Sequence, residues 1–133
     1  MTKNQIIKSI VQTYSGKKVL FKDYDVSFTH NNKDYYVKIL PATNNTIVTV
    51  NSKLVWELKK GKLNGPRFKT SSKHLYDIRN FVKLDNKIIV FNAKPYKIFK
   101  ALNESDLADI SHDNIVHNIH YFTNPNDIKS ILN

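Results

Sequence analysis

The basic side chains are the most informative chemical feature of this sequence, because they are concentrated in one segment. Residues 53–73 carry seven lysines and arginines and a single acid, whereas residues 101–133 carry five acids and one lysine. The formal net charge of the whole chain is +10 at pH 7. Basic groups at this density neutralise phosphates and release their counterions. The sequence therefore predicts a nucleic-acid partner, with DNA ranked before RNA.

The residues expected to contact nucleic acid are those of the basic segment and a tyrosine–lysine pair upstream: Lys53, Lys60, Lys62, Arg67, Lys69, Lys73, Tyr36 and Lys38. Arg67 is the best candidate for a specific contact, since a planar guanidinium grips a phosphate or a guanine edge with two hydrogen bonds. Tyr36 could stack on a base or a ribose. The alternative is that Tyr36 packs under the N-terminal helix. Three further lysines are expected to extend the basic surface: Lys17, Lys18 and Lys22.

A second group of side chains with ligand chemistry lies near the C-terminus: His112, Asp113, His117 and His120. Histidine nitrogens and a carboxylate could bind zinc. Since the chain has no cysteine and offers no dedicated fourth ligand, the sequence favours surface histidines in an acidic tail. The absence of cysteine also excludes disulfides and a thiol nucleophile.

Hydrophobic periodicity predicts an alternation of helices and strands within one domain of 133 residues, with an acidic helical tail from about residue 103. The expected order is helix 4–14, strands 24–28, 35–39 and 46–50, a basic loop 61–70, a helix from 71 or 72 to 82, a buried strand 87–91, a helix starting at Pro95, a short acidic helix 103–110 and a helix after Asn124. Residues 53–60 fit either a strand or a helix capped by Asn51 or Ser52, and the strand is slightly favoured. The fold class is α/β.

The sequence pattern predicts neither a signal peptide nor a membrane-spanning segment. The longest uninterrupted apolar run is Ile88–Phe91, far short of the roughly 20 residues that a bilayer requires. We therefore expect a cytoplasmic protein without a membrane partner.

The order of these elements resembles the core of the PD-(D/E)XK nuclease-like superfamily over roughly residues 4–102. The segments that carry the resemblance are the first helix, the strands DYDVSF, DYYVKIL and NTIVTV, the helix HLYDIRNFV and the strand KIIVF. It implies a restriction-endonuclease-like core, in which a helix and an antiparallel strand meander precede a helix, a buried strand and a further helix. It also implies DNA cleavage with a divalent metal, although many members of the superfamily are degenerate.

The resemblance also implies a set of catalytic residues. Glu57-Leu58-Lys59 matches the acid-x-Lys motif, and Asp34 lies upstream at the start of a strand. Asp34 and Glu57 would then hold Mg²⁺, with Asp25 as the reserve ligand, and Lys59 would position the attacking water. The sequence departs from the family pattern in that Lys33, not proline, precedes Asp34.

The leading expectation is therefore nucleic-acid binding by the basic segment, with metal-dependent phosphodiester cleavage where the acid-x-Lys site is intact. The alternative is a non-catalytic protein of a phage or mobile element that binds and inhibits or regulates a protein partner. In that case the acidic tail pairs with a basic partner, or with the basic segment of a second copy in a homodimer.

Overall fold

The computed structural model describes the chain except for residues 20–22, 52–53, 63–68, 104 and 133, and the side chains of residues 61–72 are likewise not described. The elements in chain order are α1 (Lys3–Tyr14), β1 (Lys17–Lys18), β2 (Val26–His30), β3 (Lys33–Leu40), β4 (Thr46–Val50), β5 (Val55–Lys62), β6 (Lys69–Asp77), the 3₁₀ helix η1 (Phe81–Lys83), β7 (Lys87–Phe91), β8 (Lys97–Ala101), β9 (Leu107–Asp109), β10 (Ile115–Val116), β11 (Ile119–Phe122) and the 3₁₀ helix η2 (Pro125–Ile131). Among the described residues, no helix has the length and apolar character needed to cross a bilayer.

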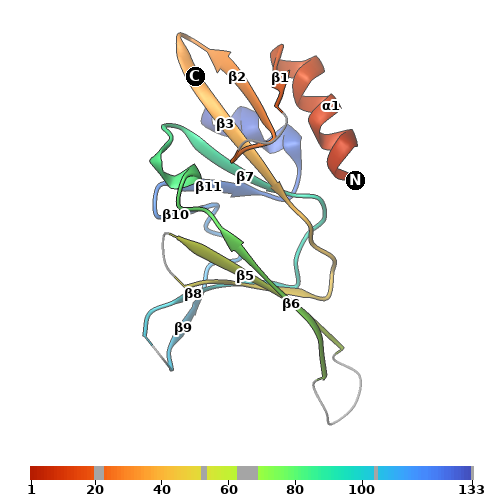
Figure 1. The fold of residues 1–133 in the computed structure, drawn as a ribbon, viewed down its shortest axis with the longest axis vertical. Coiled ribbons are helices and arrows are strands. Elements are labelled where there is room, and N and C mark those ends of the chain that lie inside the picture. The colour runs from red at the N-terminus through yellow and green to blue at the C-terminus, as the bar shows by residue number, and fades with distance from the viewer. Residues whose placement is uncertain (20–22, 52–53, 63–68, 104, 133) are drawn as a thin grey trace.

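The described strands form two mixed sheets that stack on each other (Figure 1). Sheet A has the order β1-β2-β3-β7-β11-β10, and sheet B has the order β6-β5-β4-β8-β9. The helices α1 and η2 cover the face of sheet A that points away from sheet B. The chain is therefore a single α/β domain with three layers: helices, sheet A and sheet B.

Helix α1 begins and ends where local chemistry requires it. The Thr2 hydroxyl accepts a hydrogen bond from the Gln5 backbone N–H at 3.2 Å, and the Gln5 side chain accepts one from the Thr2 N–H at 2.9 Å, which is a capping box. Ser15 closes the helix in a left-handed conformation with φ 55°. Gly16 follows, where a Cβ would lie only 3.0 Å from the Ser27 carbonyl oxygen. The predicted N-terminal helix is confirmed.

Strands β2 and β3 form the predicted hairpin. Its turn residues, Asn31 and Asn32, both have positive φ, 51° and 63°, as a two-residue type I′ turn requires. The chain then leaves sheet A, because β4 pairs with β5 and β8 in sheet B. The described strands β2, β3 and β4 thus do not form one meander, and the restriction-endonuclease-like core is not confirmed.

Strand β7 lies at the centre of sheet A, parallel to both β3 and β11. Its unbroken apolar sequence predicts a strand covered on both faces, and residues 88–91 are all fully buried. Ile88 and Val90 pack under α1, whereas Ile89 and Phe91 pack against sheet B. One strand thus joins two separate hydrophobic cores.

The helix predicted over residues 71–82 is wrong. Residues 69–77 form β6, antiparallel to β5, and only residues 81–83 are helical. The Leu75 side chain is 62% exposed. The helical spacing of Leu75, Ile78, Phe81 and Val82 predicts one buried stripe, but only Ile78 and Phe81 are fully buried. Pairing of β6 with the edge of β5 overrides this local helical pattern.

The two helices predicted between residues 95 and 110 are also wrong. Residues 97–101 form β8, which extends sheet B beside β4, and residues 107–109 form β9. The Asn103 side chain accepts hydrogen bonds from the backbone N–H groups of Ser105 and Asp106, at 2.9 and 2.8 Å. Asn103 therefore stabilises a turn instead of capping a helix.

Two further predicted elements, the strand over residues 53–60 and the helix after Asn124, are present in the structure. Residues 53–60 do contain a strand, β5, with Trp56 and Leu58 buried, although Leu54 precedes it and is 43% exposed. The helix after Asn124 is present as η2, a 3₁₀ helix capped by the Asn124 side chain. Ile128 is its fully buried residue.

The position of β7 between two cores predicts a large cost for a cavity there. Ile89→Ala should lower the free energy of unfolding by about 2–5 kcal/mol, since its side chain is fully buried. Ile115→Ala is the matched control, because Ile115 is 46% exposed and should cost well under half as much. Urea unfolding measures both variants, and equal losses would show that the interface between the sheets is not tightly packed.

Candidate nucleic-acid interface

The basic segment of the sequence forms a two-stranded ribbon, β5 and β6. Strand β4 pairs with β5 only as far as Lys60, whereas the pairing of β5 with β6 continues to Gly61–Thr70 and Lys62–Lys69. A register shift lies between Lys60 and Gly61, where the β4 pairing ends. Figure 1 shows the ribbon projecting beyond the other strands of sheet B. We call β5 and β6 the basic ribbon.

Three described lysines form a row across the outer face of sheet B. The register places Lys73 opposite Lys59, Lys59 opposite Ile47, and Ile47 opposite Lys97. Residues directly opposite on neighbouring strands point to the same face, so the row runs perpendicular to the strands. With strands spaced about 4.8 Å apart, its end-to-end length is about 14 Å. Lysines on the edge strand β6 also discourage edge-to-edge aggregation, so the row has a structural role as well.

Glu57 lies within this basic surface and is bonded to two of its lysines. The Lys59 ammonium lies 2.9 Å from one carboxylate oxygen and the Lys73 ammonium lies 3.4 Å from the other. The Glu57 side chain is only 10% exposed. Burial raises the pKa of its carboxyl, but the hydrogen bonds and charges of the two lysines outweigh burial and leave the pKa below its usual value.

The predicted metal ligands are not brought together. Asp34 lies in sheet A and accepts a hydrogen bond from the Thr29 hydroxyl at 2.7 Å, whereas Glu57 lies in sheet B. Asp25 accepts a hydrogen bond from the Ile39 N–H at 2.7 Å and pairs with Lys3 at 2.9 Å. Within the described residues, no group of three or more histidines and acids is placed to hold a metal. These side chains therefore do not fit a shared Mg²⁺ site, although Lys59 does contact Glu57.

The other predicted binding residues fall into three groups. Lys53, Arg67 and Lys22 lie outside the described residues. Lys60 is exposed on β5, Lys73 is exposed on β6, and the backbones of Lys62 and Lys69 lie opposite each other at the far end of the ribbon. The upstream residues Tyr36, Lys38, Lys17 and Lys18 all belong to sheet A and not to the ribbon.

Tyr36 is half-buried on β3. Its ring packs edge-on against Tyr24, with 5.0 Å between the centroids, and lies against the core between the two sheets. Its ring faces away from α1, so the alternative that Tyr36 packs under the N-terminal helix is wrong. Lys38 donates a hydrogen bond to the Asp23 carbonyl at 3.3 Å. Both side chains thus belong to sheet A, away from the basic ribbon, and base stacking by Tyr36 stays a prediction.

The histidines of the C-terminal third are dispersed. His112 is exposed, His117 lies in the turn between β10 and β11 with φ 50°, and His120 stacks on Phe122. Burial lowers the pKa of His120. As with the carboxylates, the described residues show no metal-holding arrangement among them.

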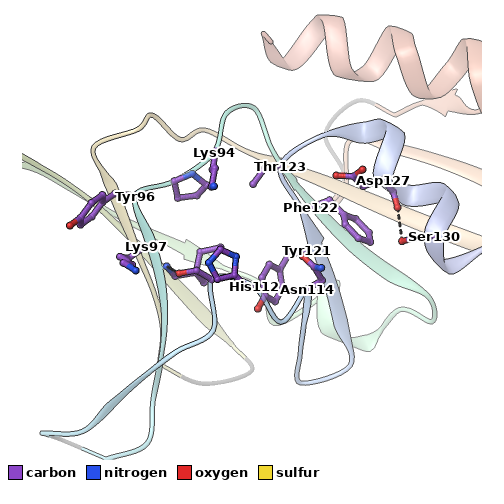
Figure 2. Close-up of a pocket in the computed structure, with 13 residues that line it drawn as sticks. Lys94, Tyr96, Lys97, His112, Asn114, Tyr121, Phe122, Thr123, Asp127 and Ser130 are labelled. Carbon is purple, nitrogen blue, oxygen red and sulfur yellow. Dashed lines mark hydrogen bonds between the residues drawn. The ribbon is translucent and has the colours of Figure 1, made fainter.

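A second candidate site, a cleft between the ends of the two sheets, was not foreseen from the sequence. It has a volume of about 770 Å³ and lies beside the carboxyl ends of β7 and β11 (Figure 2). Its lining includes Lys94, Lys97, His112, Asn114 and Asp127. These residues are far apart in sequence and share no motif, so only the strand order brings them together.

The acid dependence of stability should reveal the Glu57 ion pairs. Because the folded pKa of Glu57 is lowered, its contribution is present above the unfolded value near 4.5 and is lost as the pH falls through the folded pKa. The difference in unfolding free energy between the wild type and Glu57→Gln should therefore shrink between pH 6 and pH 3. Urea titrations at both pH values measure it. A difference that stays constant would mean that Glu57 has an ordinary pKa in the folded chain.

Comparisons with known proteins identified no relative of this chain. No protein-family model matches the sequence, and neither the curated proteins nor the solved structures contain a match.

Proposed function

We propose that this protein binds nucleic acid, DNA before RNA, through the basic ribbon. The observation that carries the proposal is the shape and charge of one element. A two-stranded antiparallel ribbon extends past its sheet, and residues 55–77 contain six basic residues against two acids. A ribbon of two strands fits the major groove of B-DNA, and its lysines can neutralise the flanking phosphates.

The acids of the chain do not cancel this charge. Among the described ion pairs, the Asp109 carboxylate bonds to Lys97 and the Asp77 carboxylate bonds to Arg79. Glu57 is the acid that contacts ribbon lysines in the described part of the chain, and it neutralises one of the two charges that it contacts. The carboxylates that follow residue 101 make no described ion pair with the ribbon, so its field remains positive.

Lysine is a point charge on a flexible stem, so it contacts phosphates better than it reads bases. Binding through the ribbon should therefore tolerate many sequences and depend steeply on salt. Cleavage remains a prediction from the nuclease resemblance, and the positions of Asp34, Asp25 and Glu57 do not support it.

Binding to a protein partner is the second candidate function, and the outer face of sheet B favours it. Ile47, Val55 and Phe99 are half-buried on this face but belong to neither core. Leu75 and Leu107, at opposite edges of the sheet, are 62% and 54% exposed. An inhibitory protein that used this face would bind one partner tightly and have little affinity for bare duplex.

Removal of ribbon lysines should weaken binding and flatten its salt dependence. The triple variant Lys60→Gln, Lys62→Gln and Lys69→Gln leaves the Glu57 ion pairs intact. Each lost phosphate contact should lower the slope of log K against log salt by about 0.9 for duplex DNA. Fluorescence anisotropy with a labelled duplex between about 50 and 200 mM salt measures this slope.

The matched control removes three lysines elsewhere: Lys8→Gln, Lys83→Gln and Lys129→Gln. It makes the same change in net charge, so it should lower the affinity for duplex DNA only slightly, through the weaker overall attraction between protein and DNA. Equal losses in both triple variants would mean that net charge, and not the ribbon, attracts DNA. Duplex, single-stranded DNA and RNA in the same salt series would rank the ligands.

Glu57→Gln separates binding from cleavage because the two functions predict opposite results. In a binding surface, the substitution releases Lys59 and Lys73 for phosphates and should raise affinity for duplex severalfold at low salt. In a metal site, it removes a ligand and should abolish cleavage of supercoiled DNA in Mg²⁺ or Mn²⁺. Gel analysis of plasmid and anisotropy on the same preparation measure both. Unchanged or weaker DNA binding by Glu57→Gln would show that Glu57 does not compete with phosphates for Lys59 and Lys73.

A further inference from the structure

The cleft lies where two neighbouring parallel strands send the chain to opposite faces of sheet A. Strand β7 pairs in parallel with β11. After β7 the chain passes into sheet B through β8, whereas after β11 it passes into η2, which packs beside α1 on the other face. When adjacent parallel strands have connections to opposite faces, a crevice opens outside their carboxyl ends, and ligands of α/β proteins bind there.

The dimensions and lining of the cleft suit a small polar molecule. Its volume of about 770 Å³ lies within the usual range of ligand sites, about 300–1,000 Å³. Pro95, Ile98 and Phe122 supply apolar surface. Figure 2 shows polar side chains around it, from the segment before β8, the connection between β9 and β10, and η2.

One wall is held in place by hydrogen bonds. The Ser111 hydroxyl donates to the Asp109 carboxylate at 2.6 Å and accepts from the Ile98 N–H at 3.0 Å. The Lys97 ammonium bonds to the same carboxylate at 3.2 Å. The hydrogen bonds from Ser111, together with Lys97, lower the pKa of Asp109 to about 2. The wall that carries Ser111 and His112 is therefore positioned before a ligand arrives, which reduces the entropy cost of binding.

Three charged or titratable side chains of the cleft have no described partner within the protein, whereas the hydroxyls of Ser130 and Tyr121 donate to backbone carbonyls. Among the described residues, the side chains of Lys94 and His112 make no hydrogen bond or ion pair, and neither does the carboxylate of Asp127. Lys94 and Asp127 follow the carboxyl ends of β7 and β11, and His112 lies on the Ser111 wall. Lysines and a histidine donor suit a dianionic phosphate, whereas a carboxylate accepts hydrogen bonds from sugar hydroxyls.

We propose that this cleft binds a small ligand of the mononucleotide class, with its phosphate at Lys94 and His112 and its hydroxyl groups toward Asp127. The site is separate from the basic ribbon and does not depend on nucleic-acid binding. The ligand is held by charge at one end and by hydrogen bonds at the other, while Pro95, Tyr96 and Phe122 line the part of the cleft that its ring would occupy.

Binding of 5′-AMP, adenosine and inorganic phosphate to the full chain, followed by NMR chemical shifts, tests the assignment. We expect saturable shifts at Lys94, His112 and Asn114 with AMP, and weaker binding of adenosine because it lacks the phosphate. Lys94→Gln and His112→Gln should each weaken AMP binding about tenfold or more, the effect of losing a charge-assisted hydrogen bond. Absence of saturable binding, or equal affinity for AMP and adenosine, would overturn the proposal.

Two controls separate the cleft from general electrostatics. Lys8→Gln removes an exposed lysine of α1 and should leave AMP affinity unchanged. The triple ribbon variant at Lys60, Lys62 and Lys69 should also retain AMP binding while losing affinity for DNA. AMP affinity that falls as much in either control as in Lys94→Gln would place the nucleotide outside the cleft, whatever the ribbon does with DNA.

Discussion

The burial of β7 on both faces is the constraint on which the rest of the structure depends. Its apolar side chains alternate between the core beneath α1 and the core against sheet B, so removing either layer would expose a whole strand face to water. This three-layer arrangement leaves no interior position for an unpaired charge. The lysines and acids therefore lie at or near the surface, and those of the projecting ribbon, the outer face of sheet B and the ends of the strands surround the two candidate sites.

Glu57 shows how such a fold places a carboxylate within a basic surface. Its side chain is nearly buried, so it would be costly if it were unpaired, and two lysines offset that cost. The same pairing holds Lys59 and Lys73 in place on the outer face of the sheet. A polyanion that binds there has to compete with one fixed carboxylate, which moderates affinity at these two lysines but not at the far end of the ribbon.

Sequence reasoning succeeded where one local pattern decided the structure. The helical spacing of apolar residues over 4–14, the polar turn at Asn31 and Asn32 and the apolar run of β7 each predict their element unaided. It failed where pairing with a distant strand decided the outcome. Residues 71–82 and 95–102 have helical spacing, but they complete sheet B as β6 and β8. The two candidate sites differ in the same way. The basic cluster could be predicted from the sequence, whereas the cleft depends on the strand order, which the sequence did not reveal.

The acid-x-Lys triplet illustrates why a motif needs its structural context. On an extended strand, residues two apart point to the same face, so Glu57 and Lys59 would contact each other in any sheet. What decides their chemistry is the neighbouring strand. Strand β6 places Lys73 opposite Lys59, and its ammonium contacts the second oxygen of Glu57. With both oxygens bonded to ammonium groups, and with Asp34 in the other sheet, the triplet works as part of an ion-pair cluster. The cross-strand neighbour thus converts a motif typical of metal chemistry into one that organises a cationic surface.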